Sequence, residues 1–577
     1  MKERLQQQLD EAVRALLAEA GDAGEIPAVA LEIPRQKEHG DFACNAALLL
    51  AKRLGRKPRE IAEALVEALG DAGGLVDRAE VAGPGFVNLW LAGDRWRDVL
   101  RGILEVGRSY GGSDEGAGVR VQVEFVSANP TGPLSTGHGR QAVLGDCIAR
   151  LLEFRGFDVT REYYFNNGGR QMRVLGQSVK ARYLEALGVA APPPAAVLAD
   201  PEKSWVDEVG GLPVQFPADG YQGDYIVELA EALCAEHGDA LVGEPAEAIF
   251  REVAEKQIFA GIRATLDALG IHFDVYSNEK TLYDEGKLDA VLEDLRAVDL
   301  IYESEGAVWL RGTTLGLDRD RVMIRSSGEP TYLLPDIAYH REKMERGFDV
   351  VVDVMGADHI DQFPFVREAT SALGYDADRI EMVMHQFVTL TRAGRKVKQS
   401  TRKANIVTAD DLLEEVGGDV FLFFMIERRA DGHLDFDLDL ATERKWNKNP
   451  AYYVQYAVAR THGIERTAAD AGLAMPGADD FDADRLDLPE ELEVMKKLGE
   501  FPELVARAAA AREPHHLAYY LRDVAGLWNP YLQDGTRHRV VSDDAGRTAA
   551  RLGLVLAVRT VLTNGLALLG IAAPERM

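Results

Sequence analysis

The 577-residue sequence contains little cysteine. Its three cysteines, Cys44, Cys147 and Cys234, are far apart and form no CxxC pair. Disulfide frameworks and structural zinc sites both need several ligating residues at short spacing. The composition therefore argues against a disulfide-stabilised fold and against a structural zinc site.

The chain also lacks an uninterrupted apolar run of membrane-spanning length. The apolar segment 552–571 is broken by Arg559, and the N-terminal segment 1–20 reads as a charged amphipathic helix rather than a signal sequence. A membrane span needs about 20 predominantly apolar residues. We therefore expect no membrane association and a cytoplasmic location.

Positive charge is scarce. The chain has 65 Lys and Arg against 94 Asp and Glu, which gives a formal net charge of -29. An acidic average would argue against nucleic-acid binding, because neutralising phosphates supplies much of such affinity. The average hides the distribution, however, so overall charge neither supports nor excludes an RNA partner. The length alone predicts about three domains.

Residues 119–146 predict a strand, a tight Pro/Gly turn and a helix that starts near Thr136. Gly137, His138 and Gly139 lie at the helix start. The first N–H groups of a helix have no partner within it, and its dipole is positive there, so an anion is stabilised. His138 adds a donor for a phosphoryl oxygen. A turn that only connects two elements is the ordinary alternative.

A second segment reverses the sign of the chain's charge. Residues 392–403 contain six basic residues and no acidic one. A solvated basic loop is the ordinary interpretation of such a run. Here Gly394 adds mobility and Ser400 a hydroxyl donor, as a loop that closes over a polyphosphate would require.

At these two segments the chain resembles the class I aminoacyl-tRNA synthetases, and most closely the arginyl-tRNA synthetase family. The family carries a His-x-Gly-His element and a Lys-Met-Ser-Lys loop, which correspond here to 135–138 and 398–401. The family's extended first pattern is present without a gap from Glu124 to Leu134. Further matches are found at 332–340, 356–359, 449–456 and 574–577.

The resemblance implies ligation of arginine to tRNA(Arg) through an arginyl-adenylate, with ATP as substrate together with Mg²⁺. Three positions depart from the family pattern, namely Ser135, Gln399 and Thr401. They leave open a synthetase-like tRNA-binding protein with weak or no charging activity. A synthetase for another amino acid is a second alternative.

The resemblance also implies a set of site residues. Those for ATP are Ser135, Gly137, His138, Gly139, Gly356, Asp358, His359 and Lys398, and those with catalytic roles are His138, Lys398 and Ser400. Asp358, His359 and Asp361 could also be interpreted as a metal cluster, but no further ligand follows at helical spacing. We therefore expect no protein-bound metal.

Arginine recognition requires carboxylates, because a planar guanidinium is matched by a carboxylate that accepts two parallel hydrogen bonds. Glu124 and Asp336 are the candidates. The resemblance adds Tyr332, and it assigns Ser127 and Asn129 to the amino and carboxylate groups of the substrate. Without the resemblance, Glu124 would be interpreted as a surface acid at a strand end and Asp336 as a helix cap.

The fold class expected is an α/β doubly wound, Rossmann-type catalytic domain, with an α+β N-terminal domain and an all-α C-terminal helical bundle. The predicted domains are 1–108, which contacts the tRNA elbow, 109–446, which is catalytic with an insertion around 165–265, and 447–577, which binds the anticodon. We expect a monomer.

The tRNA contacts implied by the resemblance are Phe86, Asn88, Tyr453, Tyr456 and Met577. Phe86 and Asn88 lie two apart on a predicted strand and therefore point the same way. Tyr453 and Tyr456 share a helix face. Aromatic side chains hold splayed RNA bases by stacking, although aromatics at these spacings are more commonly core residues.

Overall fold

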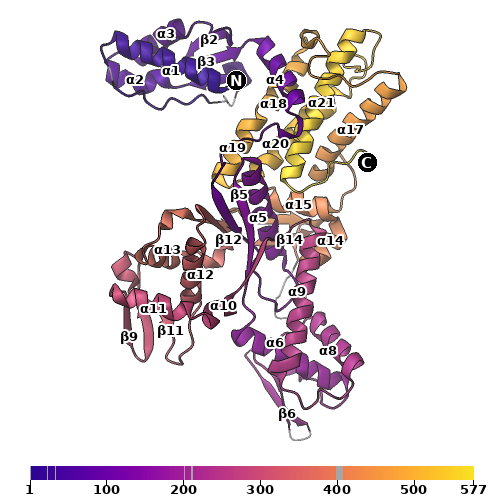
Figure 1. Ribbon diagram of the computed structural model, residues 1–577. Helices are drawn as coiled ribbons and strands as arrows, with labels where there is room; N and C mark the ends of the chain where they lie inside the picture. The colour runs from indigo at the N-terminus through magenta and orange to yellow at the C-terminus, as the bar shows by residue number, and fades with distance from the viewer. Residues whose placement is uncertain are drawn as a thin grey trace.

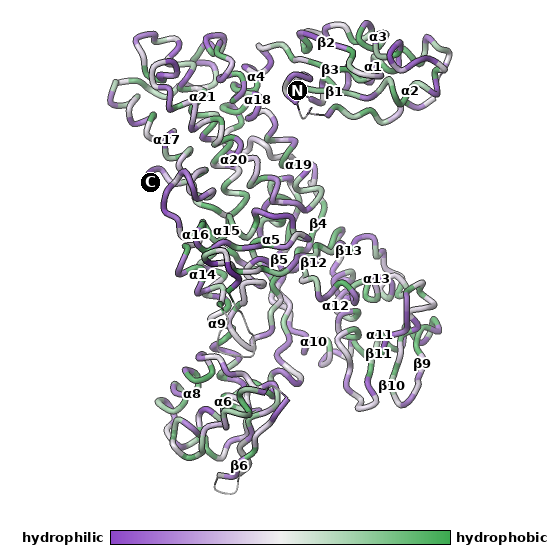
Figure 2. The backbone as a smooth tube through the Cα atoms, turned by 180° about the vertical axis from the view of Figure 1, so that it is seen from behind, coloured by the Kyte–Doolittle hydropathy of each residue, from purple (hydrophilic) through white to green (hydrophobic). Residues whose placement is uncertain are grey.

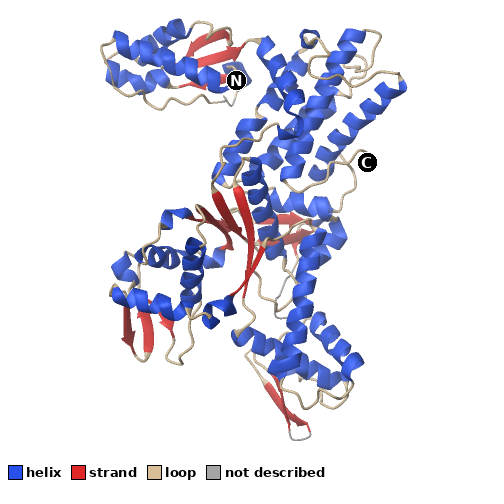
Figure 3. Cartoon of the chain, viewed as in Figure 1, coloured by secondary structure: helices blue, strands red, loops and turns tan. Residues whose placement is uncertain are grey.

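The computed structural model describes residues 2–22, 24–32, 34, 36–200, 202–209, 212–397 and 407–577. An N-terminal lobe and a helical bundle lie at one end of the molecule, two side lobes lie at the other, and the central sheet lies between them (Figure 1). Strands lie in the central part, the N-terminal lobe and the two side lobes, whereas the bundle is helical (Figure 3).

The N-terminal lobe is α+β, as predicted. Its antiparallel sheet has the order β1-β3-β2, and α2 and α3 pack on it. The next helix, α4, packs on the helical bundle. The bounds are α1 (Lys2–Glu19), β1 (Phe42–Cys44), α2 (Ala46–Leu54), α3 (Pro58–Leu69), β2 (Val76–Ala82), β3 (Phe86–Leu91) and α4 (Gly93–Val106).

The central sheet is parallel and five-stranded, with the order β13-β12-β4-β5-β8. Side chains alternate between the two faces of a strand. On β4, Val121 and Val123 are fully buried on one face, while Gln122 and Glu124 point to the other. The bounds are β4 (Arg120–Glu124), α5 (Thr136–Phe154), β5 (Asp158–Phe165), β8 (Val275–Asn278), β12 (Val350–Gly356) and β13 (Ile380–His385).

One side lobe lies between β5 and β8. It packs α6 against α8 and α9 and carries an antiparallel hairpin, β6-β7. The bounds are α6 (Gly169–Ala186), α7 (Ala195–Leu198), β6 (Trp205–Val209), β7 (Leu212–Phe216), α8 (Asp224–His237) and α9 (Arg251–Ala268).

The other side lobe follows β8. Its hydrophobic core is separate from the main core of the protein and includes residues of α12 and α13. Its antiparallel sheet, β11-β10-β9, was not predicted, because strands of four residues are too short to show a clear alternation. The bounds are α10 (Glu279–Asp284), α11 (Lys287–Ala297), β9 (Ile301–Ser304), β10 (Ala307–Leu310), β11 (Arg321–Ile324), α12 (Leu333–Glu345) and α13 (Phe363–Ala372).

A further small sheet, β15-β14-β16, connects the catalytic part to the bundle. In the bundle, α17 and α20 pack on α21. The bounds are β14 (Val388–Arg392), β15 (Arg395–Lys396), α14 (Ala409–Val416), α15 (Gly418–Ile426), β16 (Leu434–Asp437), α16 (Leu438–Ala441), α17 (Pro450–Asp470), α18 (Pro489–Gly499), α19 (Phe501–Ala511), α20 (His515–Tyr531) and α21 (Ala545–Leu568).

Helix α21 is long and apolar enough to cross a membrane by length and composition, but 72% of its apolar window is buried within the protein. Hydrophobic and hydrophilic residues alternate along the neighbouring bundle helices (Figure 2), as amphipathic packing requires. The core helix of a helical bundle accounts for the composition of α21.

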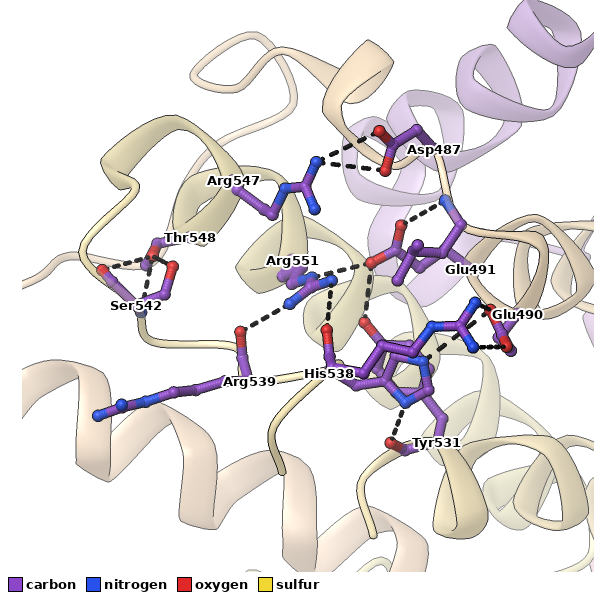
Figure 4. A network of polar contacts seen from close by, with 12 residues as sticks. Asp487, Glu490, Glu491, Tyr531, His538, Arg539, Ser542, Arg547, Thr548 and Arg551 are labelled. Carbon is purple, nitrogen blue, oxygen red and sulfur yellow. Dashed lines mark hydrogen bonds and ion pairs between the residues drawn. The ribbon is translucent and has the colours of Figure 1, made fainter. Parts of the chain in front are cut away.

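The bundle contains a buried ion pair between Glu491 on α18 and Arg551 on α21 (Figure 4). Arg551 donates from Nε to Glu491 Oε1 at 2.8 Å, and Tyr531 donates to the same oxygen at 3.0 Å. The remaining nitrogens of Arg551 donate to the backbone oxygens of Arg539 and Arg537. The pair therefore fastens the loop between α20 and α21.

Candidate active site

The start of α5 is closed by a reciprocal cap. Ser135 Oγ accepts a hydrogen bond from the backbone N–H of His138 at 3.2 Å, and the backbone N–H of Ser135 donates to His138 Nδ1 at 3.3 Å. Ser135 is thus the N-cap of the helix, a role for which serine is strongly preferred. Its departure from the family pattern places a capping hydroxyl at the helix start.

This cap also fixes the tautomer of His138. Burial lowers the pKa of the His138 imidazole, an effect that the nearby Asp358 carboxylate opposes. In the neutral ring, Nδ1 accepts from Ser135, so the proton lies on Nε2. His138 therefore offers one N–H donor beside the free N–H groups of the helix start.

The two glycines of the element differ in their surroundings. A Cβ on Gly137 would meet only the Ser135 hydroxyl, at 3.6 Å. A Cβ on Gly139 would lie 2.7 Å from the ring of Phe421, which is fully buried on α15. Gly137 thus leaves the helix start open, while Gly139 allows α5 to pack closely on α15.

Lys398 and Ser400, together with Gln399 and Thr401, lie outside the described residues. The described chain that follows them returns to the start of α5. Ser135 and Thr408 form an antiparallel bridge, and the backbone N–H of Ala409 donates to Leu134 O at 2.8 Å. The described segment that begins at residue 407 is thereby joined to the start of α5, more than 250 residues earlier in the chain.

The carboxyl ends of β12 and β13 lie beside the capped helix. Gly356 ends β12, and Asp358 and His359 follow it in a short 3-10 turn with partly exposed side chains. His385, at the end of β13, is paired with Gly356 in the sheet register. Ligands of doubly wound sheets bind at this edge. The sequence therefore placed Asp358 and His359 at the correct edge of the sheet.

Sequence reasoning did not single out His385. Burial lowers its pKa to about 4, so the ring is neutral at pH 7. Its Nδ1 faces the backbone oxygen of Gln386 at 3.4 Å, and its buried Nε2 has no hydrogen-bond partner among the described residues. His385 therefore offers a free acceptor nitrogen near Asp358 and His138.

Glu124 is the last residue of β4 and is only 4% exposed. One carboxylate oxygen, Oε2, accepts from Lys343 Nζ at 2.5 Å, and the other, Oε1, accepts from Ser127 Oγ at 2.8 Å. The structure therefore places Glu124 as a buried, paired carboxylate rather than a surface acid.

The turn after β4 is strained. Val126 and Ser127 adopt positive φ angles of 69° and 43°, which non-glycine residues rarely do. Such strain persists where surrounding contacts hold it, and it is concentrated at functional sites. Ser127 Oγ also accepts from the backbone N–H of Tyr164, and Asn129 is held by Asn166 and Gln171.

Asp336 lies in the first turn of α12. Burial raises the pKa of its carboxyl group to about 6, and the nearby Glu124 carboxylate acts in the same direction. Gln362, which the sequence analysis did not single out, donates from Nε2 to Asp336 Oδ2. Tyr332, one turn earlier, is 62% exposed. The Glu124 and Asp336 carboxylates thus lie close enough to interact electrostatically.

Known proteins match this chain over nearly its full length. Three family models match, described as "Arginyl tRNA synthetase N terminal domain" at residues 3–91, "tRNA synthetases class I (R), catalytic domain" at 100–198 and 236–423, and "DALR anticodon binding domain" at 454–577. The arginine–tRNA ligase of Salinibacter ruber is 49% identical over 570 residues, which cover 98% of this chain and 99% of that one. The chain belongs to the arginyl-tRNA synthetase family.

A second relative, the arginine–tRNA ligase of Desulfotalea psychrophila, is 47% identical over 547 residues, covering 95% of this chain and 94% of its own. The arginyl-tRNA synthetase structure from Thermus thermophilus has a TM-score of 0.74 at 24% identity and covers 99% of this chain and 100% of that one, which shows a shared fold.

Family membership confirms the predicted fold class and the assignment as a class I ligase for arginine. The synthetase-like protein without charging activity is not favoured, because the relatives that match over nearly the full length are ligases. The domain boundaries at 108 and 446 stay predictions, as do the roles of individual site residues.

The tRNA-binding residues predicted for this synthetase differ in exposure. Phe86 is 41% exposed on β3, whereas Asn88, two residues on, is 6% exposed. Phe86 is therefore available to a stacked base, and Asn88 lies beneath the surface of the sheet.

In the bundle, Tyr453 and Tyr456 both stack on Trp446, with ring centroids 6.1 and 4.1 Å apart respectively. Trp446 was not singled out from the sequence, where it marked only the end of the catalytic region. Met577, the last residue, is 58% exposed. The two tyrosines thus form one aromatic stack with Trp446 at the junction of the catalytic and helical parts.

Among the described residues, one group of His and acidic side chains brings possible metal ligands within 4.8 Å of one another, namely Glu513, His515 and His516 at the start of α20. Arg429 Nε lies 3.7 Å from a Glu513 oxygen, so a fixed positive charge already stands beside that carboxylate. This group lies on a different element from Asp358 and His359.

Proposed function

We propose that this arginyl-tRNA synthetase binds the arginine side chain between Glu124 and Asp336. The observation that carries the proposal is the buried Glu124 carboxylate, 4% exposed, whose charge helps to raise the pKa of the Asp336 carboxyl group in the first turn of α12. A buried acid without a cation is costly, and a guanidinium supplies a permanent charge with parallel donors. Gln362 and Ser127 orient the two carboxylates, and Tyr332 covers the site from its exposed side.

In the first step, an oxygen of the arginine carboxylate forms a bond to the α-phosphorus of ATP, and the bond to the bridging oxygen breaks as pyrophosphate leaves. His138 Nε2–H and the N–H groups at the start of α5 donate to phosphoryl oxygens. Lys398 and Ser400 neutralise and bind the leaving pyrophosphate. Mg²⁺ enters with ATP as part of the substrate and shares its charge.

The nucleoside of ATP binds across Gly356, Asp358 and His359, at the carboxyl ends of β12 and β13. His385 supports this assignment, because its free, neutral Nε2 is an acceptor for an N–H or O–H group of the nucleoside. In the second step, the 2′-hydroxyl of the terminal adenosine of tRNA attacks the arginyl carbonyl carbon, and AMP leaves.

Phe86 and Asn88 contact the tRNA elbow, and Tyr453, Tyr456 and Met577 contact the anticodon arm, with Trp446 as a further member of the stack. The protein acts as a cytoplasmic monomer without a structural zinc ion. Equilibrium sedimentation tests the oligomeric state.

The test of the assignment is ATP–pyrophosphate exchange with tRNA present, assayed with each amino acid separately. Arginine alone should support exchange. Exchange with a neutral amino acid at a comparable rate would remove the role proposed for Glu124 and Asp336. An inactive wild type would instead support the synthetase-like alternative.

The loop residues have a separate test. Lys398→Ala should lower the turnover of adenylate formation far more than ground-state ATP affinity, because its charge is most useful as pyrophosphate leaves. Single-turnover adenylate formation is compared with equilibrium ATP binding. Equal losses in both would make Lys398 a simple binding residue.

A further inference from the structure

Three carboxylates lie in a row across the central sheet. Glu124 on β4 is paired in register with Asp353 on β12 and with Glu162 on β5. All three point to the same face, because residues at matched register share a side of the sheet. They are 4%, 0% and 0% exposed respectively. Like charges at neighbouring register positions repel, so this row requires counter-charges.

Helix α12 supplies these counter-charges. Lys343 donates from Nζ to Glu124 Oε2 at 2.5 Å and to Asp353 Oδ1 at 2.6 Å, and it is fully buried. Arg346, three residues later, donates to Glu162 Oε2 at 2.7 Å. Figure 1 shows α12 beside the central sheet, with its axis close to β12.

Contacts on several sides hold the Lys343 side chain in one position. Its ammonium group lies 4.4 Å from the centre of the Tyr339 ring, one turn earlier on α12. Burial opposes its charge, but the Asp353 and Glu124 carboxylates raise the pKa of Lys343 above its usual value. Asp353 Oδ2 contacts His340 Nε2 at 2.7 Å, which holds the second carboxylate in place. The ammonium is therefore a fixed bridge between two strands.

The same helix carries the arginine subsite at its other end. Asp336 lies two turns before Lys343, and the backbone oxygen of Asp336 contacts His340 Nδ1 at 2.7 Å. His340 thus links the backbone under Asp336 to the carboxylate of Asp353. One helix sets both the position of Asp336 and the orientation of Glu124.

We propose that Lys343 is a positioning residue for arginine recognition, which holds Glu124 Oε2 against Asp353 so that Glu124 Oε1 faces the substrate guanidinium. The inference rests on the proposed role of Glu124. Lys343 shares its single ammonium group between Glu124 and Asp353, whose other oxygen contacts His340, so only one oxygen of Glu124 is held by the cation. Without the ammonium, Glu124 and Asp353 repel each other and the carboxylate turns away.

Lys343→Met tests the proposal, because methionine has a similar shape without the charge. The Michaelis constant for arginine should rise about tenfold to a hundredfold, as misplacement of a recognition group by about 1 Å can cost a hundredfold. The Michaelis constant for ATP should change less than about threefold, since Lys343 contacts no part of the ATP site. Lys343→Arg keeps a cation and should restore part of the arginine affinity.

Arg346→Met is the matched control. It removes a cation from the same helix and the same row of acids, but Arg346 pairs with Glu162 and makes no hydrogen bond to Glu124 among the described residues. Thermal unfolding should show a lower melting temperature for both variants, whereas the Michaelis constant for arginine should rise only for Lys343→Met. Equal increases in both variants would overturn the proposal in favour of a general structural role.

Two further variants keep the test decisive. The double variant Lys343→Met/Asp353→Asn removes the ammonium with one of its carboxylates, so it restores charge balance if the single variant does not fold. It should fold and still bind arginine weakly, and arginine affinity equal to wild type in it would overturn the proposal. Glu124→Gln tests the proposed function itself, because an unchanged Michaelis constant for arginine there removes Glu124 from the subsite whatever Lys343 does.

Discussion

Two regions of the molecule bury charged side chains, and they balance them differently. In the bundle, Glu491 faces one guanidinium, that of Arg551, and Tyr531 completes its hydrogen bonding (Figure 4). The negative and positive charges there are equal in number. Nothing remains for a ligand, and the pair only fastens a loop.

In the catalytic domain, the row of Asp353, Glu124 and Glu162 faces Lys343 and Arg346, and Asp336 adds a further acid nearby. Acids outnumber permanent cations. Both regions are buried, so burial alone does not distinguish a structural network from a binding site. The balance of negative and positive charges distinguishes the two, because an unbalanced buried charge is costly until a ligand binds.

The largest effect should follow from Asp336→Asn, which removes a carboxylate that makes no salt bridge among the described residues. Arginine affinity should fall by about 3–5 kcal/mol, the cost of losing a buried charge partner, while ATP affinity is retained. Isothermal titration with each ligand measures both. Unchanged arginine affinity would contradict the assignment of Asp336 to the subsite.

In the bundle, Arg551→Met should act on stability alone. It leaves the Glu491 carboxylate buried without a partner, so the free energy of unfolding should fall by about 3 kcal/mol or more. The Michaelis constant for arginine should not change. Urea unfolding is compared with Arg547→Met, whose partly exposed pair with Asp487 should contribute less than about 1 kcal/mol. A raised Michaelis constant for arginine in Arg551→Met would contradict the distinction between a structural network and a binding site.

The pH dependence of arginine binding sharpens the comparison further. The raised pKa of Asp336, about 6, means that the arginine-free site holds a proton below that pH. Arginine binds the ionised carboxylate, so its apparent affinity should be constant above pH 6 and fall about tenfold per pH unit below it. In Asp336→Asn this dependence should be absent, and a profile that persists there would assign the proton to another group.

The smallest effect should follow from Ser135→His, which restores the family residue at the start of α5. Ser135 already caps the helix and fixes the tautomer of His138, so the wild type should be active and the activation rate should change only a few-fold. Loss of a needed transition-state donor would cost on the order of 10²–10³-fold. An inactive wild type rescued by histidine would show that Ser135 had removed such a donor.

Much of the fold could be predicted from the sequence. The helix that starts at Thr136 followed from the Pro/Gly turn before it, and the doubly wound sheet from alternating strand-like and helix-like segments. Gln399 and Thr401 lie in a segment outside the described residues, so the structure does not test their effect on the loop.

The counter-charges could not be predicted. Residues 339–346 read as a charged, solvated helix face, because Lys343 and Arg346 stand among other charged residues. Only the register that pairs Glu124 with Asp353 and Glu162 shows that both cations point into the sheet. Gln362 was missed for the same reason, since its partner Asp336 is 26 residues away in the sequence.

The central claim is that the buried charge of the catalytic domain selects a cationic side chain. The most direct test is ATP–pyrophosphate exchange with tRNA present, comparing arginine with citrulline, in which a urea oxygen replaces one guanidinium nitrogen. The account predicts that kcat/KM for citrulline is lower by about 10³-fold or more, because a neutral side chain leaves the Asp336 carboxylate without a charged partner. Values within about tenfold of each other would contradict it.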